Sequence, residues 1–489
     1  MRSRVVLAVV ALALFVAQAW RGAGYFHADE YFQTVELASY KLGVTRASEL
    51  PWEFDARIRP FLQPGAYVAA ARGLALFGVE GRGATLLAFR LCGALLAWMA
   101  LCLLAVALGG RVKDERGRTL LLAGCLLTWY VPYLSARTSS ENLSGSMLAL
   151  ALASWLLLVR RPLLGAVFAG LALGIAFDLR YQTAFTALGF AAWLALVRRE
   201  RLPALAMLAV GFIAAAGLGF AVDRWGYGEW TATPWNYLRV NLIEGKARQW
   251  GSQPATFYLA GLLGVHPPLS GLLLAAVVLF WLRAPKDPIT WMTLPFAFGH
   301  AILAHKELRF LFPLGPLAAA IPPLLLVDPG IRLERLRGWF ARHPGVLRAA
   351  ALLDLAFLAA LVLVPIRHDV SPQAALHDRL VSRPGTKVAL LRTEPYADGP
   401  LPLAYLRPPG FAPVQVASWA EVAALADAGG PVDVVARLAD LPPPEFRERY
   451  AATLLAAPLP ERVARALAKA IGRTGMVALW SVERRPPRG

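Results

Sequence analysis

Apolar stretches of membrane-spanning length recur along most of the chain, separated by short polar links and two long polar segments. A helix that crosses a bilayer needs about 20 mainly apolar residues, and lipid offers no partners to the backbone of an irregular segment. The pattern therefore predicts an α-helical polytopic membrane protein with about eleven transmembrane helices. The expected spans are residues 5–22, 84–109, 119–135, 142–159, 162–178, 181–197, 203–222, 257–281, 288–304, 309–327 and 346–366.

Basic residues in the short links predict the topology. With this count of spans, every strongly basic short link falls on one side, whereas an error of one span would scatter them. Lys and Arg accumulate in cytoplasmic links, so this side is expected to be inside. The basic links are 110–118, 160–161, 198–201, 283–286 and 332–342. The outer side receives 23–83, 135–142, 178–182, 223–256, 305–309 and the chain after about 367, and we predict that these polar segments form the walls of one site.

The first apolar segment has two interpretations. Arg2 and Arg4 precede an apolar run, and Ala17-Gln18-Ala19 resembles a signal-peptide cleavage site. A retained first helix is favoured because many spans follow it. Under either interpretation the two arginines stay inside and residues 27–33 come outside.

The outer segment 23–83 is too long for a plain connector. Glu30–Leu42 and Pro64–Phe77 have the helical spacing of apolar side chains, but neither is long enough to span. We therefore predict amphipathic helices at the membrane interface. The aromatic residues expected at headgroup level are Trp52, Phe54 and Phe61.

The composition changes after residue 366, where β-rich runs alternate with helical stretches. This alternation predicts a transmembrane domain at 1–366 followed by a small soluble α/β domain at 367–489. The expected strands are Lys387–Leu391, Pro413–Val416, Val432–Val435 and Met476–Trp480, and the expected helices are Ala420–Ala428 and Arg462–Gly472. No phosphate-binding glycine motif opens these helices, so a supporting role is expected.

Composition narrows the function classes. The 489 residues are 57% hydrophobic with a net charge of +18, and the mean hydropathy is +0.51. In a membrane protein such a basic excess marks cytoplasmic links, and no nucleic-acid module is present. Cys92, Cys102 and Cys125 all lie in apolar segments, where free thiols act as small hydrophobes. The spacing offers neither a disulfide framework nor a metal site.

The densest candidate chemistry follows the first span, where His27, Asp29 and Glu30 stand at the membrane surface. One interpretation is a helix N-terminus, where the helix dipole stabilises acidic side chains. The other is a general base, or a carboxylate that orients a hydroxyl nucleophile. The residues alone leave both open.

Two cationic segments could bind phosphate. Arg57 and Arg59 alternate with apolar residues, which suits either snorkelling at the interface or an arginine fork for phosphate. The turn at 305–309 carries His305, Lys306 and Arg309 between two spans. A tight turn rarely needs such charge density, so a phosphate clamp is the preferred interpretation.

Two further links on the outer side carry charge. Arg137, Glu141 and Asn142 occur together at the predicted start of a helix, where Ser139 or Ser140 could be a simple cap. Arg180 follows a span, and a local pair with Asp178 is the structural alternative to a binding role.

The second long outer segment mixes aromatic and hydrogen-bonding residues, namely Asp223, Trp230, Asn236 and Tyr237 with their neighbours. An aromatic belt at the interface is one interpretation. Aromatic faces beside hydrogen-bonding groups also suit sugars, which have apolar C–H faces and polar hydroxyls.

Taken together, these segments resemble the membrane mannosyltransferases of the N-glycan and GPI-anchor pathways, glycosyltransferase family 22, whose architecture is called GT-C. The resemblance covers about residues 20–320, and its most telling parts are the His-x-Asp-Glu of the first outer loop and the His-Lys-Glu turn. The matching segments, in the family's order, are 27–33, 52–59, 137–142, 223–237 and 305–313.

The resemblance implies an inverting transferase that uses a polyprenyl-phosphate-linked sugar, usually mannose, with a lipid-linked glycan or glycolipid as acceptor. An acidic residue of the first outer loop would be the base, which makes Asp29 the first candidate and Glu30 the second. The donor carries its own activated phosphate, so no metal is required, although a divalent ion is compatible. The sequence has a bacterial character, which predicts a location in the inner membrane, in contact with membrane lipids. The site and the C-terminal domain are then expected on the periplasmic side.

The remaining candidates divide into two groups. The donor-phosphate group is Lys306, Arg309, His305, Arg137 and Arg180. The sugar or acceptor group is His27, Arg57, Arg59, Glu141, Asn142, Asp223, Trp230, Asn236 and Tyr237. Two alternatives to an enzyme are a flippase for lipid-linked glycans and a noncatalytic binder of them. A flippase predicts polar residues at mid-membrane, whereas here they gather at one face.

Overall fold

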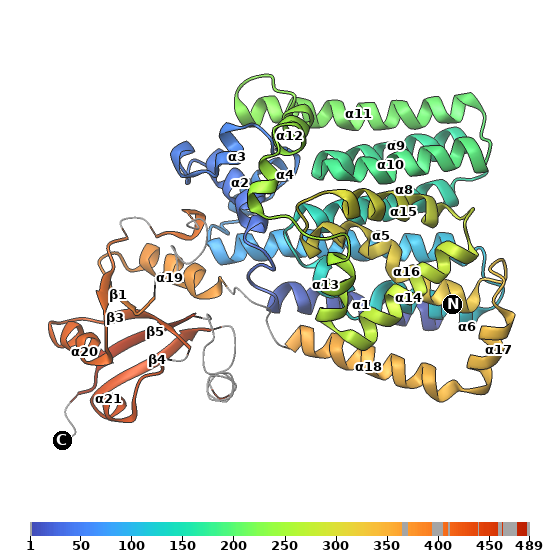
Figure 1. Cartoon of the computed structure of the whole chain (residues 1–489). Coiled ribbons are helices and arrows are strands. Elements are labelled where there is room, and N and C mark those ends of the chain that lie inside the picture. Colours follow the sequence, from blue (N-terminus) through green and yellow to red (C-terminus); the bar gives the residue numbers. More distant parts are fainter. Residues whose placement is uncertain are drawn as a thin grey trace. The chain divides into compact units, whose positions relative to one another are not determined.

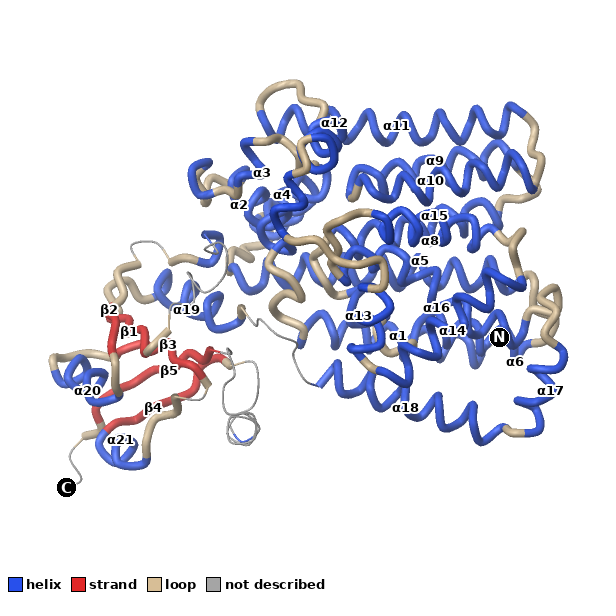
Figure 2. The backbone as a smooth tube through the Cα atoms, viewed as in Figure 1, coloured by secondary structure: helices blue, strands red, loops and turns tan. Residues whose placement is uncertain are grey.

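The computed structural model describes residues 2–363, 370–393, 404–408, 411–438, 440–457, 462 and 477–486. Within these residues the chain is mostly helical, with one small sheet (Figures 1 and 2). It divides into two compact units. The helical unit comprises Met1–Gln18, Trp52–Gly65 and Leu91–Val362, and the sheet unit comprises Ala19–Pro51, Ala66–Arg90 and Leu363–Gly489. The domain boundary at residue 366 stays a prediction.

Helices joined by short links make up the helical unit, although residues 19–21 and 82–90 of two of these helices belong to the sheet unit. Prolines stand at the first turns of many of them, where a missing N–H costs no hydrogen bond. The helices are α1 (Arg2–Arg21), α3 (Trp52–Asp55), α5 (Arg82–Gly109), α6 (Glu115–Leu127), α7 (Val131–Ser135), α8 (Ser140–Leu157), α9 (Pro162–Leu179), α10 (Ala184–Ala192), α11 (Leu202–Tyr227), α12 (Thr233–Leu238), α13 (Phe257–Val265), α14 (Pro267–Arg283), α15 (Pro288–Ile302), α16 (Gly315–Val327), α17 (Glu334–Arg342) and α18 (Pro344–Leu363).

Six of the described helices are long and apolar enough to cross a membrane, or seven if α14 and α15, bent by 119°, form one broken span. The other predicted spans coincide with helices that are shorter or interrupted. The stretch 119–135 divides into α6 and α7, and 257–281 breaks at His266, whose side chain caps α14. The multi-span character is confirmed, and the number of eleven stays a prediction.

Helices α9 and α11 pack against each other through glycines, and Figure 1 shows them side by side. A Cβ atom on Gly170 would lie 2.1 Å from the carbonyl oxygen of Leu208, and one on Gly211 would lie 2.3 Å from that of Val167. Small residues allow two helix backbones to approach this closely. Because Arg180 directly follows α9, this packing also positions a candidate site residue.

Gly211→Ala is therefore expected to lower the thermal stability of the purified protein. The added methyl group has no space, and overpacking of this kind costs about 1–3 kcal/mol. Gly217→Ala on the same helix is the matched control, because nothing lies within 4 Å of its Cβ position. That control should gain up to ~1 kcal/mol from helix propensity. Thermal unfolding in detergent measures both variants, and equal melting temperatures would contradict the close packing.

A five-stranded mixed sheet forms the centre of the sheet unit, shown in red in Figure 2. The strand order is β2-β1-β3-β5-β4, with β1 parallel to β2 and β3, and β5 antiparallel to β3 and β4. The strands are β1 (Lys387–Leu391), β2 (Val414–Val416), β3 (Val432–Arg437), β4 (Tyr450–Ala456) and β5 (Val477–Arg484). Helix α19 (Ser371–Ser382) covers one face through Leu376, and α20 (Trp419–Asp427) and α21 (Pro444–Arg449) cover the other.

The predicted α/β character of this region is confirmed. All four predicted strands lie on observed ones, although Met476 is outside the described residues. The predicted helix at 420–428 corresponds to α20, whereas the helix predicted at 462–472 lies almost wholly outside the described residues. Strand β4 was not predicted, because its Ala-Ala-Thr-Leu-Leu-Ala sequence favours a helix and pairing with β5 overrides that preference.

The first outer segment is helical where the sequence predicts it. A helix begins at Asp29, makes a π-helical turn at Tyr31–Val35 and continues as α2 (Glu36–Lys41), and α4 (Leu62–Ala75) follows after two short turns. Residues 30–39 are all buried, so this helix differs from the expected surface-lying one. Phe61 is also buried, against Phe54, Trp225 and Tyr227, rather than exposed to headgroups.

A buried carboxylate lies within this segment. Burial raises the pKa of Glu36 to about 7, against the opposing effects of hydrogen bonds from Tyr405 and Thr45 and of the nearby Arg407 and Arg82. The folded protein therefore binds this proton more tightly than the unfolded chain does. The resulting stabilisation is fully present below pH 4.5, the ordinary value, and is lost as the pH rises through 7.

The unfolding free energy is thus expected to fall by about 3 kcal/mol between pH 4.5 and 8 through this one group. The Gln side chain of Glu36→Gln cannot titrate, so the unfolding free energy of this variant should not show this decrease with pH. Denaturant unfolding of both proteins across the pH range measures the difference. An identical slope in the variant would show that Glu36 titrates normally in the folded protein.

Candidate functional site

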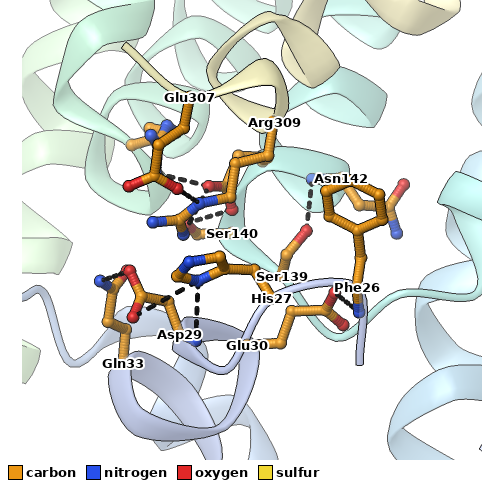
Figure 3. Close-up of polar contacts among 12 residues, drawn as sticks. Phe26, His27, Asp29, Glu30, Gln33, Ser139, Ser140, Asn142, Glu307 and Arg309 are labelled. Carbon is orange, nitrogen blue, oxygen red and sulfur yellow. Dashed lines mark hydrogen bonds and ion pairs between the residues drawn. The ribbon is translucent and has the colours of Figure 1, made fainter. Parts of the chain in front are cut away.

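The first-loop acids of the sheet unit begin a helix, and Figure 3 shows them. The Glu30 carboxylate reaches back and accepts a hydrogen bond from the backbone N–H of Phe26 at 2.8 Å. Glu30 is only 4% exposed. In a capping box, an acidic side chain in the first turn of a helix accepts a hydrogen bond from a backbone N–H before the helix, and this contact is similar. The hydrogen bond therefore supports the interpretation of Glu30 as part of a helix N-terminus.

Asp29 is in a different situation. Its side chain is 24% exposed, and Gln33 donates a hydrogen bond to its carboxylate at 2.6 Å (Figure 3). The His27 ring accepts a hydrogen bond from the Asp29 N–H at 3.3 Å, and its Nδ1 lies 3.6 Å from the carboxylate. His27 and Gln33 therefore orient a carboxylate that keeps access to solvent. The π-helical turn that follows is a distortion often found at functional sites.

In the helical unit, a buried carboxylate joins two arginines from distant parts of the sequence. Glu141 on α8 lies 2.9 Å from Arg180 and 3.3 Å from Arg309, measured between carboxylate oxygen and guanidinium nitrogen. All three side chains are less than a tenth exposed. Both guanidinium groups also lie over the Phe310 ring, 5.0 and 5.4 Å from its centre. Arg309 also pairs with Glu307 at 2.5 Å, so the two guanidinium groups are held by two carboxylates.

One donor of Arg180 meets no partner within the described part of the protein. Its Nε atom is buried and has no hydrogen-bond partner in the structure. The predicted alternative, a local pair with Asp178, is not formed among the described residues, because Arg180 pairs with Glu141 instead. Buried donors are nearly always paired, so an unpaired one calls for an explanation, and an anionic ligand would supply it.

The turn at 305–309 presents its charges on two sides. Glu307 is extended, and its carboxylate joins His305 at 3.0 Å and Arg309 at 2.5 Å (Figure 3 shows the Arg309 contact). In extended chain, alternate residues share a side. The hydrogen bond with Glu307 raises the pKa of His305 in spite of burial. The Lys306 ammonium instead donates to the carbonyls of Gln253 and Leu303, and its phosphate role stays a prediction.

Arg137 and Asn142 lie at the N-terminus of α8. The Asn142 amide donates to the carbonyls of Ser135 and Arg137, and Ser139 caps the helix by accepting from the Asn142 N–H, as Figure 3 shows. The Arg137 guanidinium lies over the Tyr133 ring at 4.9 Å. Asn142 thus shapes the turn that holds Arg137, and the binding roles predicted for both residues stay predictions.

Asp223 joins three segments of the helical unit. Its carboxylate accepts a hydrogen bond from the Phe61 N–H at 2.6 Å and another from the Thr233 hydroxyl. Tyr181 in turn donates to Thr233 at 2.8 Å. Asp223 is buried and both its oxygens accept hydrogen bonds from the chain, which fits a structural junction. Its predicted role toward sugar stays untested.

Five more of the predicted sugar-binding residues belong to the same unit. Asn236 donates to the Arg57 carbonyl at 3.3 Å, and the Arg57 side chain pairs with Glu229. Arg59 pairs with Glu53 and lies 5.6 Å from the centre of the Tyr237 ring. Trp230 is 60% exposed and stacks on Phe220. The structure thus brings Asn236 to Arg57 and Tyr237 to Arg59 within the helical unit. The prediction of one site built from all outer segments stays a prediction.

Sequence reasoning missed several residues that hold the candidates in place. Gln33 follows Asp29 by one helical turn, a spacing that could have identified it. Glu307 lies within the predicted turn but was not predicted as a site residue, although the His-x-Glu-x-Arg alternation was the available signal. Tyr181 and Thr233 act through the fold, and no local pattern marks them. Among the described residues, no group of three or more His, Cys, Asp or Glu side chains could hold a metal ion.

A protein-family model and two relatives each match more than half of this chain. A model of the "Alg9-like mannosyltransferase family" matches residues 5–368. GPI alpha-1,2-mannosyltransferase 3 of Mus musculus is 27% identical over 342 residues, which are 68% of this chain and 59% of that protein. The "Probable Dol-P-Man:Man(7)GlcNAc(2)-PP-Dol alpha-1,6-mannosyltransferase" of Schizosaccharomyces pombe is 24% identical over 279 residues, 56% of this chain and 48% of that protein. The chain thus spans about half to three fifths of the length of these relatives.

A solved structure agrees with the fold. The crystal structure of ArnT from Cupriavidus metallidurans bound to undecaprenyl phosphate has a TM-score of 0.52 and covers 98% of this chain and 97% of that chain, at 15% identity. At this identity the likeness concerns the fold alone. The predicted GT-C fold, with its small C-terminal sheet, is confirmed.

Proposed function

Because the chain belongs to the Alg9-like mannosyltransferase family, as the sequence motifs indicated, we propose that it is an inverting glycosyltransferase. It moves a hexose, most simply mannose, from a polyprenyl-phosphate-linked donor to a lipid-linked glycan or glycolipid. The names of the mouse and fission-yeast relatives support mannose, and the latter name includes Dol-P-Man. The reaction would take place on the outer, periplasmic face of the inner membrane.

The observation that carries this proposal is the contrast between the two first-loop acids. Asp29 is partly exposed and held by Gln33 and His27, whereas Glu30 is buried and bound to the Phe26 N–H. A base must reach the hydroxyl proton that it takes. We therefore assign the base to Asp29.

The transfer then proceeds in one displacement. The Asp29 carboxylate takes the proton of the acceptor hydroxyl as that oxygen attacks the anomeric carbon. The bond from the anomeric carbon to the phosphate oxygen breaks, and polyprenyl phosphate leaves with the electron pair. The nucleophile arrives opposite the leaving group, so the configuration inverts.

The leaving phosphate gains negative charge, and positioned cations stabilise that change. Arg180 and Arg309 are the proposed phosphate ligands, since both are buried against one shared carboxylate and the Arg180 Nε donor has no hydrogen-bond partner. His305, joined to Arg309 through Glu307, supports the second arginine. Phe310 gives the two guanidinium planes a common surface.

The test is reconstitution. Purified protein in bilayers is incubated with a panel of polyprenyl-phosphate sugars and candidate acceptor lipids, and the product linkage and anomeric configuration are determined. A product whose anomeric configuration is opposite to that of the donor supports the proposal. Movement of lipid-linked glycan between leaflets without a new bond would identify a flippase, and binding without either would identify a noncatalytic binder.

A further inference from the structure

The first outer helix and the C-terminal region share one hydrophobic core in the sheet unit. Tyr31, Phe32 and Val35 from the first loop belong to the same cluster as Tyr405 and Leu406. Other members come from Tyr67 to Phe89 and from Val370 and Ala374. The helix that carries the proposed base is therefore packed directly on residues that come more than 300 positions later in the sequence.

One carboxylate connects the two segments through hydrogen bonds. The two oxygens of Glu36 lie 3.0 and 3.2 Å from the backbone nitrogen of Tyr405, which donates to them. Thr45 also donates to Glu36, at 2.8 Å, and shares a hydrogen bond with Ser39. Glu36 is 2% exposed. Glu36 therefore adds buried hydrogen bonds to a mainly apolar contact between the first outer helix and the C-terminal region.

Neighbouring charges hold the same C-terminal segment. Arg407 pairs with Glu49 of the first loop at 2.8 Å. The Arg82 guanidinium lies over the Tyr405 ring at 4.6 Å, and the Arg82 N–H donates to Asp378 on α19. Residues 404–407 are thus held from the first loop and from the start of α5. We call the contact of Glu36 with Tyr405 the loop clamp.

A buried carboxylate is a costly way to fasten two apolar surfaces. Desolvation of the charge offsets most of what its hydrogen bonds contribute, and an apolar side chain would often be as stable. A carboxylate does, however, fix one register, because both of its oxygens meet the main-chain N–H of one residue, Tyr405. Glu36 also lies close to the proposed base along the chain. It follows Asp29 by seven residues, which is two turns of the same helical segment, or about 10 Å.

We propose that Glu36 is a positioning residue, and that the C-terminal domain uses the loop clamp to hold the helix bearing Asp29 in its catalytic orientation. This inference rests on the proposed function, in which Asp29 is the base. It gives the C-terminal domain a role in catalysis without requiring that any of its side chains meet the substrate.

The test compares Glu36→Ala and Glu36→Gln with Asp433→Asn in the full-length protein. Asp433 is buried in the same unit and pairs with Arg379 at 2.7 and 2.9 Å, away from the first loop. The control therefore weakens the sheet unit without touching the clamp. Gln keeps an amide oxygen that can accept from the Tyr405 N–H, whereas Ala does not.

Glu36→Ala is expected to lower kcat at least tenfold with less than a twofold change in donor KM. Glu36→Gln should retain at least half of the wild-type kcat. Asp433→Asn should retain kcat even where its melting temperature falls as far as that of Glu36→Ala. The inference is overturned if kcat follows melting temperature in all three variants, or if Gln lowers kcat as much as Ala does.

Hydrogen exchange keeps the test independent of the reaction. The amides of residues 29–36 should exchange at least tenfold faster in Glu36→Ala than in wild type, and at wild-type rates in Asp433→Asn. Unchanged exchange in Glu36→Ala would overturn the clamp even if the enzyme is confirmed. Faster exchange in a protein that transfers no sugar would instead retain the clamp and reject the proposed function.

Discussion

Asp29→Asn is expected to reduce kcat for sugar transfer by about 100- to 10,000-fold, the usual contribution of a positioned general base. Asparagine has the size of aspartate, and its amide oxygen can still accept the hydrogen bond from Gln33. The variant loses the negative charge and, with it, the capacity to take a proton. Because the side chain is partly exposed at a helix start, the lost charge–dipole interaction should cost less than about 1 kcal/mol of stability.

Two matched variants separate this role from a general effect of charge. Asp55→Asn removes the same charge from an exposed position of the first outer loop and should leave kcat unchanged. Glu30→Gln keeps an oxygen that can accept from the Phe26 N–H, and it should change kcat by less than tenfold. Initial rates at saturating donor, together with melting temperatures, measure all three.

The outcome assigns the base directly. If Asp29→Asn keeps kcat within tenfold of wild type, Asp29 is not the base. If Glu30→Gln lowers kcat more than Asp29→Asn does, the role moves to Glu30, and the hydrogen bond to Phe26 N–H in this structure then orients a catalytic group instead of capping a helix.

Arg180→Lys and Arg309→Lys should each reduce kcat/KM for the polyprenyl-phosphate sugar by about 100-fold, or about 2.7 kcal/mol. Lysine keeps a positive charge beside Glu141 but lacks the planar fork that binds two phosphate oxygens. Alanine would be a poorer test. It would remove one of the two cations beside a buried carboxylate, and breaking such a pair costs 3–5 kcal/mol of folding stability.

A surface arginine supplies the control for this series. Arg198 is 44% exposed and pairs with Glu200, so Arg198→Lys should leave donor kinetics unchanged. Free polyprenyl phosphate, used as a competitive inhibitor, reports phosphate binding without catalysis, and its inhibition constant should rise with the donor effect in both arginine variants. Donor kinetics and inhibition within twofold of wild type would remove the two arginines from the phosphate site.

The pattern of apolar and polar residues was enough for the membrane class and for the helices of the first outer loop. The length of an apolar stretch can be read locally from the sequence. A stretch of that length in lipid must form a helix, because the backbone N–H and C=O groups find no other hydrogen-bond partners there. Asp29 and Glu30 were also visible in the sequence, because adjacent acids after a membrane span are unusual wherever the chain goes next. Their unequal environments were not visible, since the burial of Glu30 and the exposure of Asp29 depend on how the whole chain packs.

The sequence by itself thus determined the residue types, the helical segments and most of the strands. Only the tertiary structure decided which residues meet. It joined Glu141 to Arg180 and Arg309 rather than Arg180 to Asp178, it paired the helix-favouring β4 with β5, and it brought Tyr405 to Glu36. Local propensity acts over a few residues, whereas a buried charge takes its partner from whatever the packed chain places beside it.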